Sequence, residues 1–482
     1  MKLLVLGIDG GERRILQAMP MPHLHRFMRE SSLHDAKVDM WSRGWSEIYT
    51  GLHGMHTGGL YKKPSCNGQY EFNERYNLEV LHEVNPTVRP IWDELSAKGH
   101  RVGIMNIPTT MPAPSVNGFF VSGVGGGSAK NGAADLPDGA CFPTTVAGEL
   151  QRMGYVTDFR VAASGVTDIN VMFDSIEQME AKRTQCFVEL ARQHRIDFGF
   201  IAYMGIKSVS YLLNADIQSL IERHMQPVTA MDERLLSFFS RMDELYRQLL
   251  EQLQPDVTLL VSDHGMAPYL KNVNVNAFLM AQQWQTPNRS ASGWVRTIGR
   301  SVKQLLPGGV SRSLGRRAPG MREFVGKPNF DLKDSKALGF SYIPGIFIND
   351  ARFGGGHDAG DRVLLDEIVD SFNQHAGAAA EGMKAEVYRA KHLGVKGARF
   401  LPDIWIHHPD TIYFRRQGPF VSDNPAYKPF TSFAELVSDM NSGIKGETPL
   451  LYLHGAAPNV TAVAKGEHDL TLANALITAC MN

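Results

Sequence analysis

The stretch VTLLVSDHG, from Val257 to Gly265, joins a short apolar run to a serine, an aspartate and a histidine. Runs of this kind recur along the chain, as LLVLGID (3–9), RVGIMN (101–106), FGFIAY (198–203) and IPGIFIN (343–349). Apolar runs without polar alternation, separated by helix-like segments, are typical of parallel strands that are buried on both faces. The sequence therefore predicts an α/β fold with a mostly parallel sheet flanked by helices.

Helix signals occupy the segments between these runs. IWDELSAKGH (91–100) stops at Gly99, and residues 231–253 form a long amphipathic pattern. SGVGGGSAKNGAADLPDG (122–139) is interpreted as a loop, because its glycines lack the spacing of a nucleotide-binding fingerprint. A basic segment at 288–322 separates two core strands. We expect one catalytic domain over residues 1–482, with 288–322 as an inserted solvated cap; contact with an anionic substrate or membrane is the alternative.

Composition excludes several classes of protein. The chain has 482 residues, with 49 Lys and Arg against 50 Asp and Glu, so nothing in its overall charge indicates a nucleic acid or an anionic membrane as partner. Its four cysteines form no CxxC pair, which argues against a disulfide framework or a thiolate zinc site. No run approaches the ~18 apolar residues of a membrane span. The first residues read as a strand and not as a signal peptide, so we expect a cytoplasmic protein.

Polar side chains follow two of the expected strands directly. Asp9 follows the first run, and Asp263 and His264 follow the run that opens this section. In an open parallel sheet, functional groups gather just beyond the carboxyl ends of the strands. Two carboxylates and an imidazole are a ligand set suited to zinc or manganese. The alternative for each residue alone is an ordinary turn at the end of a strand.

The stretch DMWSRGWSEIYTG (39–51) carries two tryptophans and two serines. If residues 43–50 form a helix, Ser42 is its N-cap and Gly51 its stop. The helix amides would then face whatever Ser42 contacts, and a serine beside a dication can attack phosphorus. The alternative is that Ser42 only caps the helix. Trp41 and Trp45 either line a pocket or pack in the core.

The blocks LLVLGIDGG, EIYTG and VSDHGM resemble those of the alkaline phosphatase superfamily, in particular its type I phosphodiesterase/nucleotide pyrophosphatase branch. The resemblance continues through 106–123 and 346–356 to LPDIWIHHPD (401–410). It implies an alkaline-phosphatase-like fold and the hydrolysis of phosphate esters, diesters or nucleotide pyrophosphates above all. It also implies a divalent metal, zinc or alternatively manganese, and a small phosphorylated or otherwise anionic substrate.

The resemblance also implies roles for individual residues. Asp9, Asp263 and His264 match one metal site of the family. The family's nucleophile lies about ten residues before the glycine of the Thr-Gly pair. Trp41 occupies that offset here, so Ser42, one residue later, is our candidate, with Ser46 in reserve.

The family's second metal site is altered in this sequence. Its Asp and His positions match Lys207 and Tyr211, and His454 is the candidate for its remaining C-terminal ligand. One imidazole cannot hold zinc alone, so we expect one ion and not two. Lys207 is expected to replace the missing cation, and an exposed loop lysine is the alternative.

Two other functions remain open from the sequence. One is a sulfatase or phospho-group transferase that uses a single metal ion. The other is a non-catalytic member of the family that binds an anionic ligand or a partner protein.

Overall fold

A computed structural model of the chain describes residues 1–482 except 124–135, 160, 289–329, 436–439, 457–459 and 461–468. The described residues form two compact units, and the expected single catalytic domain stays a prediction. Unit 1 comprises Met1–Tyr61, Glu74–Pro268 and Ser442–Asn482, and unit 2 comprises Lys62–Asn73 and Tyr269–Asn441. The expected basic cap at 288–322 lies outside the described residues apart from residue 288, so its role stays a prediction.

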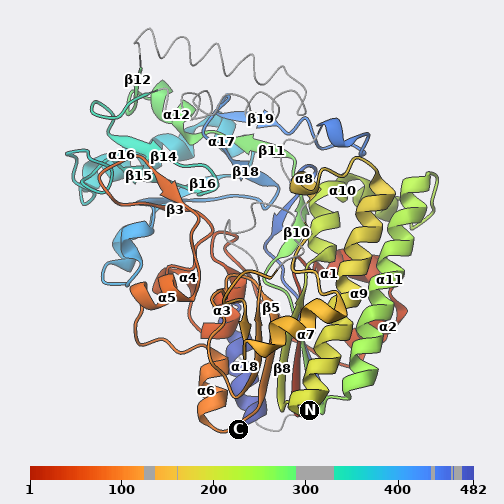
Figure 1. Ribbon diagram of the computed structural model, residues 1–482. Helices are drawn as coiled ribbons and strands as arrows, with labels where there is room; N and C mark the ends of the chain where they lie inside the picture. Colours follow the sequence, from red (N-terminus) through yellow and green to blue (C-terminus); the bar gives the residue numbers. More distant parts are fainter. Residues whose placement is uncertain (124–135, 160, 289–329, 436–439, 457–459, 461–468) are drawn as a thin grey trace. The chain divides into compact units, whose positions relative to one another are not determined.

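Unit 1 is built on an eight-stranded sheet with the order β2-β21-β9-β1-β8-β5-β6-β7 (Figure 1). Its five central parallel strands are β9 (Val257–Val261), β1 (Leu3–Ile8), β8 (Phe198–Tyr203), β5 (Val102–Ile107) and β6 (Gly118–Ser122). The edge strands are antiparallel: β2 (Ser32–Leu33), β21 (Leu451–His454) and β7 (Cys141–Phe142). The mostly parallel α/β sheet predicted from the apolar runs is confirmed.

Helices cover both faces of this sheet, which is why its strands carry apolar residues without alternation. Every residue of β1 is buried. On one face Leu3 and Val5 join a core with residues of α3 (Gly44–Thr50), α6 (Ile91–Ala97) and α18 (Thr471–Met481). A second layer of helices, seen in Figure 1, contains α2 (Pro22–Arg29), α9 (Ile169–His194), α10 (Gly205–Glu222) and α11 (Ala230–Leu253). The helix expected at 231–253 is confirmed as α11.

The parallel register places the carboxyl ends of β1, β8 and β9 at the same edge of the sheet. Ile8 of β1 lies opposite Tyr203 of β8, and Gly7 lies opposite Val261 of β9. The residues that follow β1, β8 and β9 therefore leave the sheet at the same edge. The shorter elements of unit 1 are α1 (Arg13–Ala18), α4 (Gly54–Thr57), α5 (Leu78–Val84), α7 (Thr145–Met153), α8 (Val161–Ser164), β10 (Gly265–Pro268) and β20 (Gly443–Gly446).

Unit 2 contains an antiparallel sheet of four strands and a mixed sheet of three strands. A four-stranded sheet has the order β14-β15-β17-β16, formed by Ala337–Gly339, Gly345–Ile348, Ile404–His407 and Lys384–Val387. A three-stranded sheet has the order β18-β11-β19, formed by Ile412–Phe414, Lys271–Val273 and Val421–Asp423. Helices α12 (Val275–Ala281) and α16 (Arg362–Gln374) share its apolar core. Its remaining elements are β3 (Lys63–Pro64), β4 (Phe72–Asn73), β12 (Thr286–Pro287), β13 (Phe330–Asp331) and α17 (Ala376–Ala380).

One apolar run was wrongly assigned to the parallel sheet. IPGIFIN contains β15, which is completely buried but pairs antiparallel with β14 and β17 in unit 2. A strand buried on both faces has the same apolar pattern in either kind of sheet. Among the described residues, no helix has the length and apolarity that crossing a membrane requires.

Candidate metal centre

Asp9, Asp263 and His264 meet at the carboxyl edge of the central sheet. One ligand atom from each lies within 4.8 Å of the others, and all three side chains are buried. His264 Nε2 lies 3.6 Å from Asp9 Oδ1 and 3.5 Å from Asp263 Oδ2. The structure thus brings together the three residues that the strand ends predicted.

The histidine is held in a form that can bind a metal. His264 Nδ1 lies 2.6 Å from the carbonyl oxygen of Gly265, so Nδ1 carries the proton and donates it. Nε2 is left as the atom with a free lone pair. Burial, together with the charge of Lys445, lowers the pKa of His264 to about 3. The imidazole is therefore neutral, as a metal ligand must be.

Asp9 has one oxygen that is held and one that is free. Its Oδ2 accepts a hydrogen bond from Trp45 Nε1 at 3.2 Å and lies 3.3 Å from Lys207 Nζ. Its Oδ1 has no hydrogen-bond partner among the residues that the structure describes. Burial raises the pKa of Asp9, but the charges of Lys207, His264 and Lys445 lower it further, so the net direction is down.

Asp263 is oriented by two donors. The backbone N–H of Gly10 donates to Oδ1 at 3.3 Å, and the hydroxyl of Tyr61 donates to Oδ2 at 3.1 Å. Burial and the neighbouring negative charge of Asp9 raise the pKa of Asp263 to about 7.

The donor set fits a divalent cation. The free Asp9 Oδ1 and the His264 Nε2 lone pair face each other without a proton between them, an arrangement that is costly for buried groups unless a cation separates them. The buried carboxylate of Asp263 adds a third ligand on the same side. Buried carboxylates and a neutral imidazole with fixed outer partners are ligands that zinc and manganese use.

Lys207 reaches this centre from the first turn of α10. The start of α10 is fixed by Glu180, whose Oε1 accepts the N–H groups of Met204 at 2.7 Å and Gly205 at 2.6 Å. Glu180 is itself paired with the fully buried Arg183 at 2.5 Å. Lys207 is therefore part of the centre and not an exposed loop residue.

Sequence reasoning missed Lys445. It lies on β20, opposite Met266 of β10, and its Nζ is 2.9 Å from the centroid of the Tyr61 ring. Burial lowers the pKa of Lys445 to about 7, against the opposing charges of Asp263 and Asp9. No local pattern in SGIKGE marks this lysine, because only the pairing of β20 with β10 brings it to the centre.

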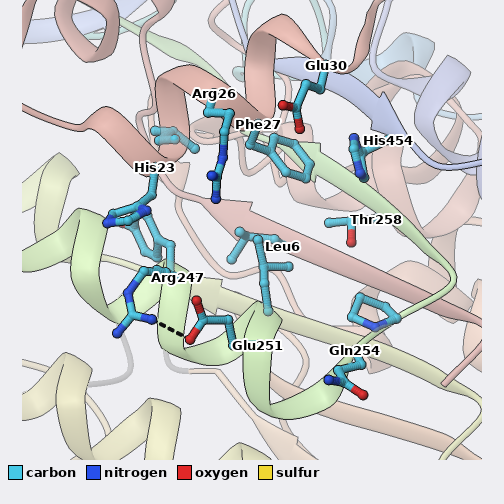
Figure 2. Close-up of a pocket in the computed structure, with 14 residues that line it drawn as sticks. Leu6, His23, Arg26, Phe27, Glu30, Arg247, Glu251, Gln254, Thr258 and His454 are labelled. Atoms are coloured by element: carbon cyan, nitrogen blue, oxygen red, sulfur yellow. Dashed lines mark hydrogen bonds and ion pairs between the residues drawn. The ribbon is translucent and has the colours of Figure 1, made fainter.

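His454 is not part of the cluster. It lies on β21 opposite Thr258, near the start of β9, roughly 16 Å along an extended chain from Asp263. Figure 2 shows it beside Phe27 in a pocket at that end of the sheet, with ring centroids 5.1 Å apart. The sequence-based role as a metal ligand required β21 to end at the same edge as β9. Because β21 is antiparallel to β9, it ends at the opposite edge.

Ser42 precedes α3 but does not cap it. The helix begins at Gly44, its N-cap is Arg43, and the Arg43 side chain makes no capping hydrogen bond. The expected N-cap role of Ser42 is therefore wrong by one residue, whereas Gly51 ends the helix in the left-handed region, as expected. The hydroxyl of Ser42 instead donates to Asp39 Oδ2 at 2.9 Å.

The other aromatic and hydroxyl residues of this stretch are deeply buried. Trp41 is 1% exposed and Trp45 3%. Trp45 serves both expected purposes, because its ring packs against Phe200 while its Nε1 holds Asp9. Ser46 is 0% exposed and bonds the hydroxyl of Tyr76 at 2.6 Å, which does not suit the reserve nucleophile.

The first residue of α3 lies against the metal centre. A Cβ atom on Gly44 would fall 2.0 Å from the carbonyl oxygen of Asp263. Only glycine lets the backbone of α3 approach the end of β9 this closely. Ser42 lies two residues before Gly44, the residue that makes this contact with Asp263.

The type I phosphodiesterase / nucleotide pyrophosphatase family model matches residues 3–325. The chain belongs to this family. A comparison with curated proteins finds no match.

Two solved structures are similar to this chain, and the first of them supports the α/β fold described above. Phosphonoacetate hydrolase from Sinorhizobium meliloti 1021, in complex with phosphonoformate, is 12% identical over 100% of this chain and 96% of that chain, with a TM-score of 0.53. An inactive variant of murine ectonucleotide pyrophosphatase / phosphodiesterase 5, in complex with AMP, is 14% identical over 100% and 95%, with a TM-score of 0.49. At such identities the similarity concerns the fold alone.

Proposed function

We propose that this protein is a metal-dependent hydrolase of phosphate esters, in particular phosphodiesters or nucleotide pyrophosphates, with Ser42 as its nucleophile. Membership of the family supports hydrolysis of a phosphate ester. The observation that carries metal dependence is the free Asp9 Oδ1 facing the lone pair of His264 Nε2.

Asp9, Asp263 and His264 would hold one dication, zinc or alternatively manganese. A dication there would polarise a phosphoryl oxygen and stabilise the charge that develops on it. The chain's own residues prepare the ligands: Trp45 and Lys207 fix one carboxylate of the set, and Tyr61 and Gly10 fix the other.

Two lysines, the half-buried Lys207 and the buried Lys445, would supply positive charge in place of a second ion. Lys207 approaches Asp9, and Lys445 lies on the ring of the tyrosine that bonds Asp263. Ammonium groups directed at a phosphoryl group stabilise its equatorial oxygens as the attacking oxygen approaches. Ser42, beside the segment that touches Asp263, would supply that oxygen. The substrate would be a small phosphorylated molecule.

The same lysines favour one rival, a sulfatase or phospho-group transferase that uses a single metal ion. Two ammonium groups and one dication suit a sulfuryl group as well as a phosphoryl group. The identity of the transferred group therefore has to be tested and not assumed.

A substrate screen separates these functions. Purified protein with added Zn²⁺ or Mn²⁺ is offered p-nitrophenyl esters of phosphate, of phosphate diesters, of phosphonate and of sulfate. We expect release of p-nitrophenol from phosphate diesters, abolished by EDTA and reduced by several orders of magnitude in Ser42→Ala. Preference for the sulfate ester would support the rival, and a lack of turnover on every ester would favour a non-catalytic binding protein.

A further inference from the structure

Ser42, Asp39 and His53 form a compact hydrogen-bonded group beside the start of α3. The Ser42 hydroxyl donates to Asp39 Oδ2 at 2.9 Å, and His53 Nε2 lies 3.1 Å from the same oxygen. His53 Nε2 is also 3.4 Å from Ser42 Oγ. A hydroxyl, a carboxylate and an imidazole thus meet at one oxygen atom.

The carboxylate of this group is held rigidly. Its other oxygen, Asp39 Oδ1, accepts the N–H of Trp41 at 3.0 Å and that of Ser42 at 2.6 Å. On the other side of the hydroxyl lies Gly54, where a Cβ atom would fall 2.6 Å from Ser42 Oγ. The hydroxyl is therefore aimed at Asp39 before any substrate arrives, which removes an orientational cost from the reaction.

His53 is fixed on the far side of the carboxylate. Its Nε2 lies 3.5 Å from Glu47 Oε1, and that oxygen also accepts the N–H of Gly54 at 3.2 Å. Burial opposes protonation of His53, but its bond to Asp39 and the charges of Asp39 and Glu47 raise its pKa to about 9. Its Nδ1 accepts the backbone N–H of Met55 at 3.3 Å, so Nε2 carries the ring proton, donates it to Asp39 and cannot take a proton from serine.

The remaining acceptor for the serine proton is the carboxylate. Burial raises the pKa of Asp39, but the hydrogen bond and charge of His53 lower it further, so the net direction is down. The group is thus ionised and has a lone pair directed at the Ser42 hydroxyl. An ionised carboxylate within hydrogen-bond reach is positioned as a general base.

We propose that Asp39 is the general base for Ser42 and that His53 is the positioning residue that holds Asp39. The proposal rests on the proposed function in taking Ser42 as the nucleophile. The Ser42 Oγ–H bond breaks and its proton passes to Asp39 Oδ2 while Oγ forms a bond to phosphorus. The bond from phosphorus to the leaving group breaks, and the leaving group departs with the electron pair and takes a proton from solvent.

The substitution Asp39→Asn distinguishes a general base from a residue that only holds the turn before α3. An asparagine keeps the carbonyl oxygen that accepts the N–H groups of Trp41 and Ser42, so the local turn is retained. It replaces the oxygen facing the Ser42 hydroxyl by an NH₂ group, which cannot accept a proton. A loss of reactivity in a folded Asp39→Asn protein therefore reports on the base.

The test uses a fluorophosphonate probe and does not depend on the natural substrate. The full chain is treated with EDTA and exposed to diisopropyl fluorophosphate, and the modified serine is mapped by mass spectrometry. The Oγ–P bond forms, fluoride leaves, and the proton goes to Asp39. We expect labelling of Ser42 in the wild type, about 100-fold slower labelling in Asp39→Asn and about tenfold slower labelling in His53→Gln. Ser46→Ala is the matched control and should be labelled at the wild-type rate.

Several results would overturn the proposal: unchanged labelling in Asp39→Asn, labelling that requires Zn²⁺ or Mn²⁺, labelling of another serine, or no labelling of the wild type. If Asp39→Asn does not fold, His53→Gln is tested in its place, and labelling of His53→Gln at the wild-type rate would overturn the proposal. Labelling of Ser42 that depends on Asp39, in a protein that turns over no phosphate ester, would leave this proposal standing and reject the proposed function.

Discussion

Replacing Gly44 by alanine is expected to damage the metal centre while leaving the sheet folded. The new Cβ atom would lie 2.0 Å from the carbonyl oxygen of Asp263 and 2.6 Å from Leu470 Cδ1. Carbon and oxygen atoms approach to about 3.3 Å at closest, so α3 and the end of β9 must separate by about 1.3 Å. The oxygen belongs to the backbone and cannot rotate away, so the side chains of Asp263 and His264 move with it.

That displacement exceeds what a metal site tolerates. Ligand positions must be kept within about 0.5 Å of the productive geometry, and disturbing the support of a site typically costs 10- to 100-fold in metal affinity. Overpacking at a buried position costs about 1–3 kcal/mol of unfolding free energy. We therefore expect Gly44→Ala to bind Zn²⁺ or Mn²⁺ about 10- to 100-fold more weakly and to unfold at lower denaturant concentration.

Isothermal titration calorimetry and urea unfolding measure both effects. Gly148→Ala is the matched control, since Gly148 lies within α7 and a Cβ atom there meets nothing within 4 Å. The control should keep wild-type metal affinity and gain up to about 1 kcal/mol of stability, because alanine is favoured over glycine inside a helix. Wild-type metal affinity in Gly44→Ala, with unchanged unfolding, would show that the contact between α3 and the end of β9 does not position the ligands.

Three further substitutions test Lys207, His454 and Glu180 in turn. Lys207→Met removes the ammonium group that faces Asp9, so kcat should fall about 100-fold while metal stoichiometry is kept; steady-state kinetics at wild-type rates would contradict this. His454→Ala should leave metal stoichiometry unchanged, because His454 lies at the other end of β9; loss of metal in elemental analysis would restore it as a ligand. Glu180→Gln removes the charge paired with the buried Arg183 and should cost about 3 kcal/mol of unfolding free energy by urea denaturation; a cost below about 1 kcal/mol would show that the pair is not needed.

The cluster of Asp9, Asp263 and His264 could be predicted from the sequence for a physical reason. A strand covered by helices on both faces has to be apolar along its length, so a polar residue marks the point where it leaves the core. Asp9 and Asp263 occupy that point on neighbouring parallel strands, and the level register of β1 and β9 brings them together. The ends of the apolar runs therefore predict which residues lie at this edge of the sheet.

Strand direction and long-range pairing are not contained in such patterns. His454 follows an apolar run like the others, but β21 runs antiparallel and ends at the opposite edge. Lys445 lies in a short polar segment and reaches the centre only through the pairing of β20 with β10. Tyr61, which bonds Asp263, follows a loop without any motif. These residues depend on contacts between distant segments, which one sequence does not show.

The position of Ser42 was predicted in part. A helix ending at Gly51 was expected and is observed, but it begins one residue later than expected, after Arg43. The turn formed by Asp39 accounts for the shift, because it binds the backbone N–H groups of Trp41 and Ser42 ahead of the helix. Aspartate side chains that bond nearby amides compete with helical hydrogen bonds.

We expect Asp9, Asp263 and His264 to bind one divalent metal ion. Elemental analysis of the purified protein, after loading with Zn²⁺ or Mn²⁺ and removal of excess ion, tests it most directly, with circular dichroism to confirm folding. We expect one ion per chain in the wild type and none in a folded Asp263→Ala variant. A wild-type protein that retains no dication, or an Asp263→Ala variant that retains the full amount, would contradict it.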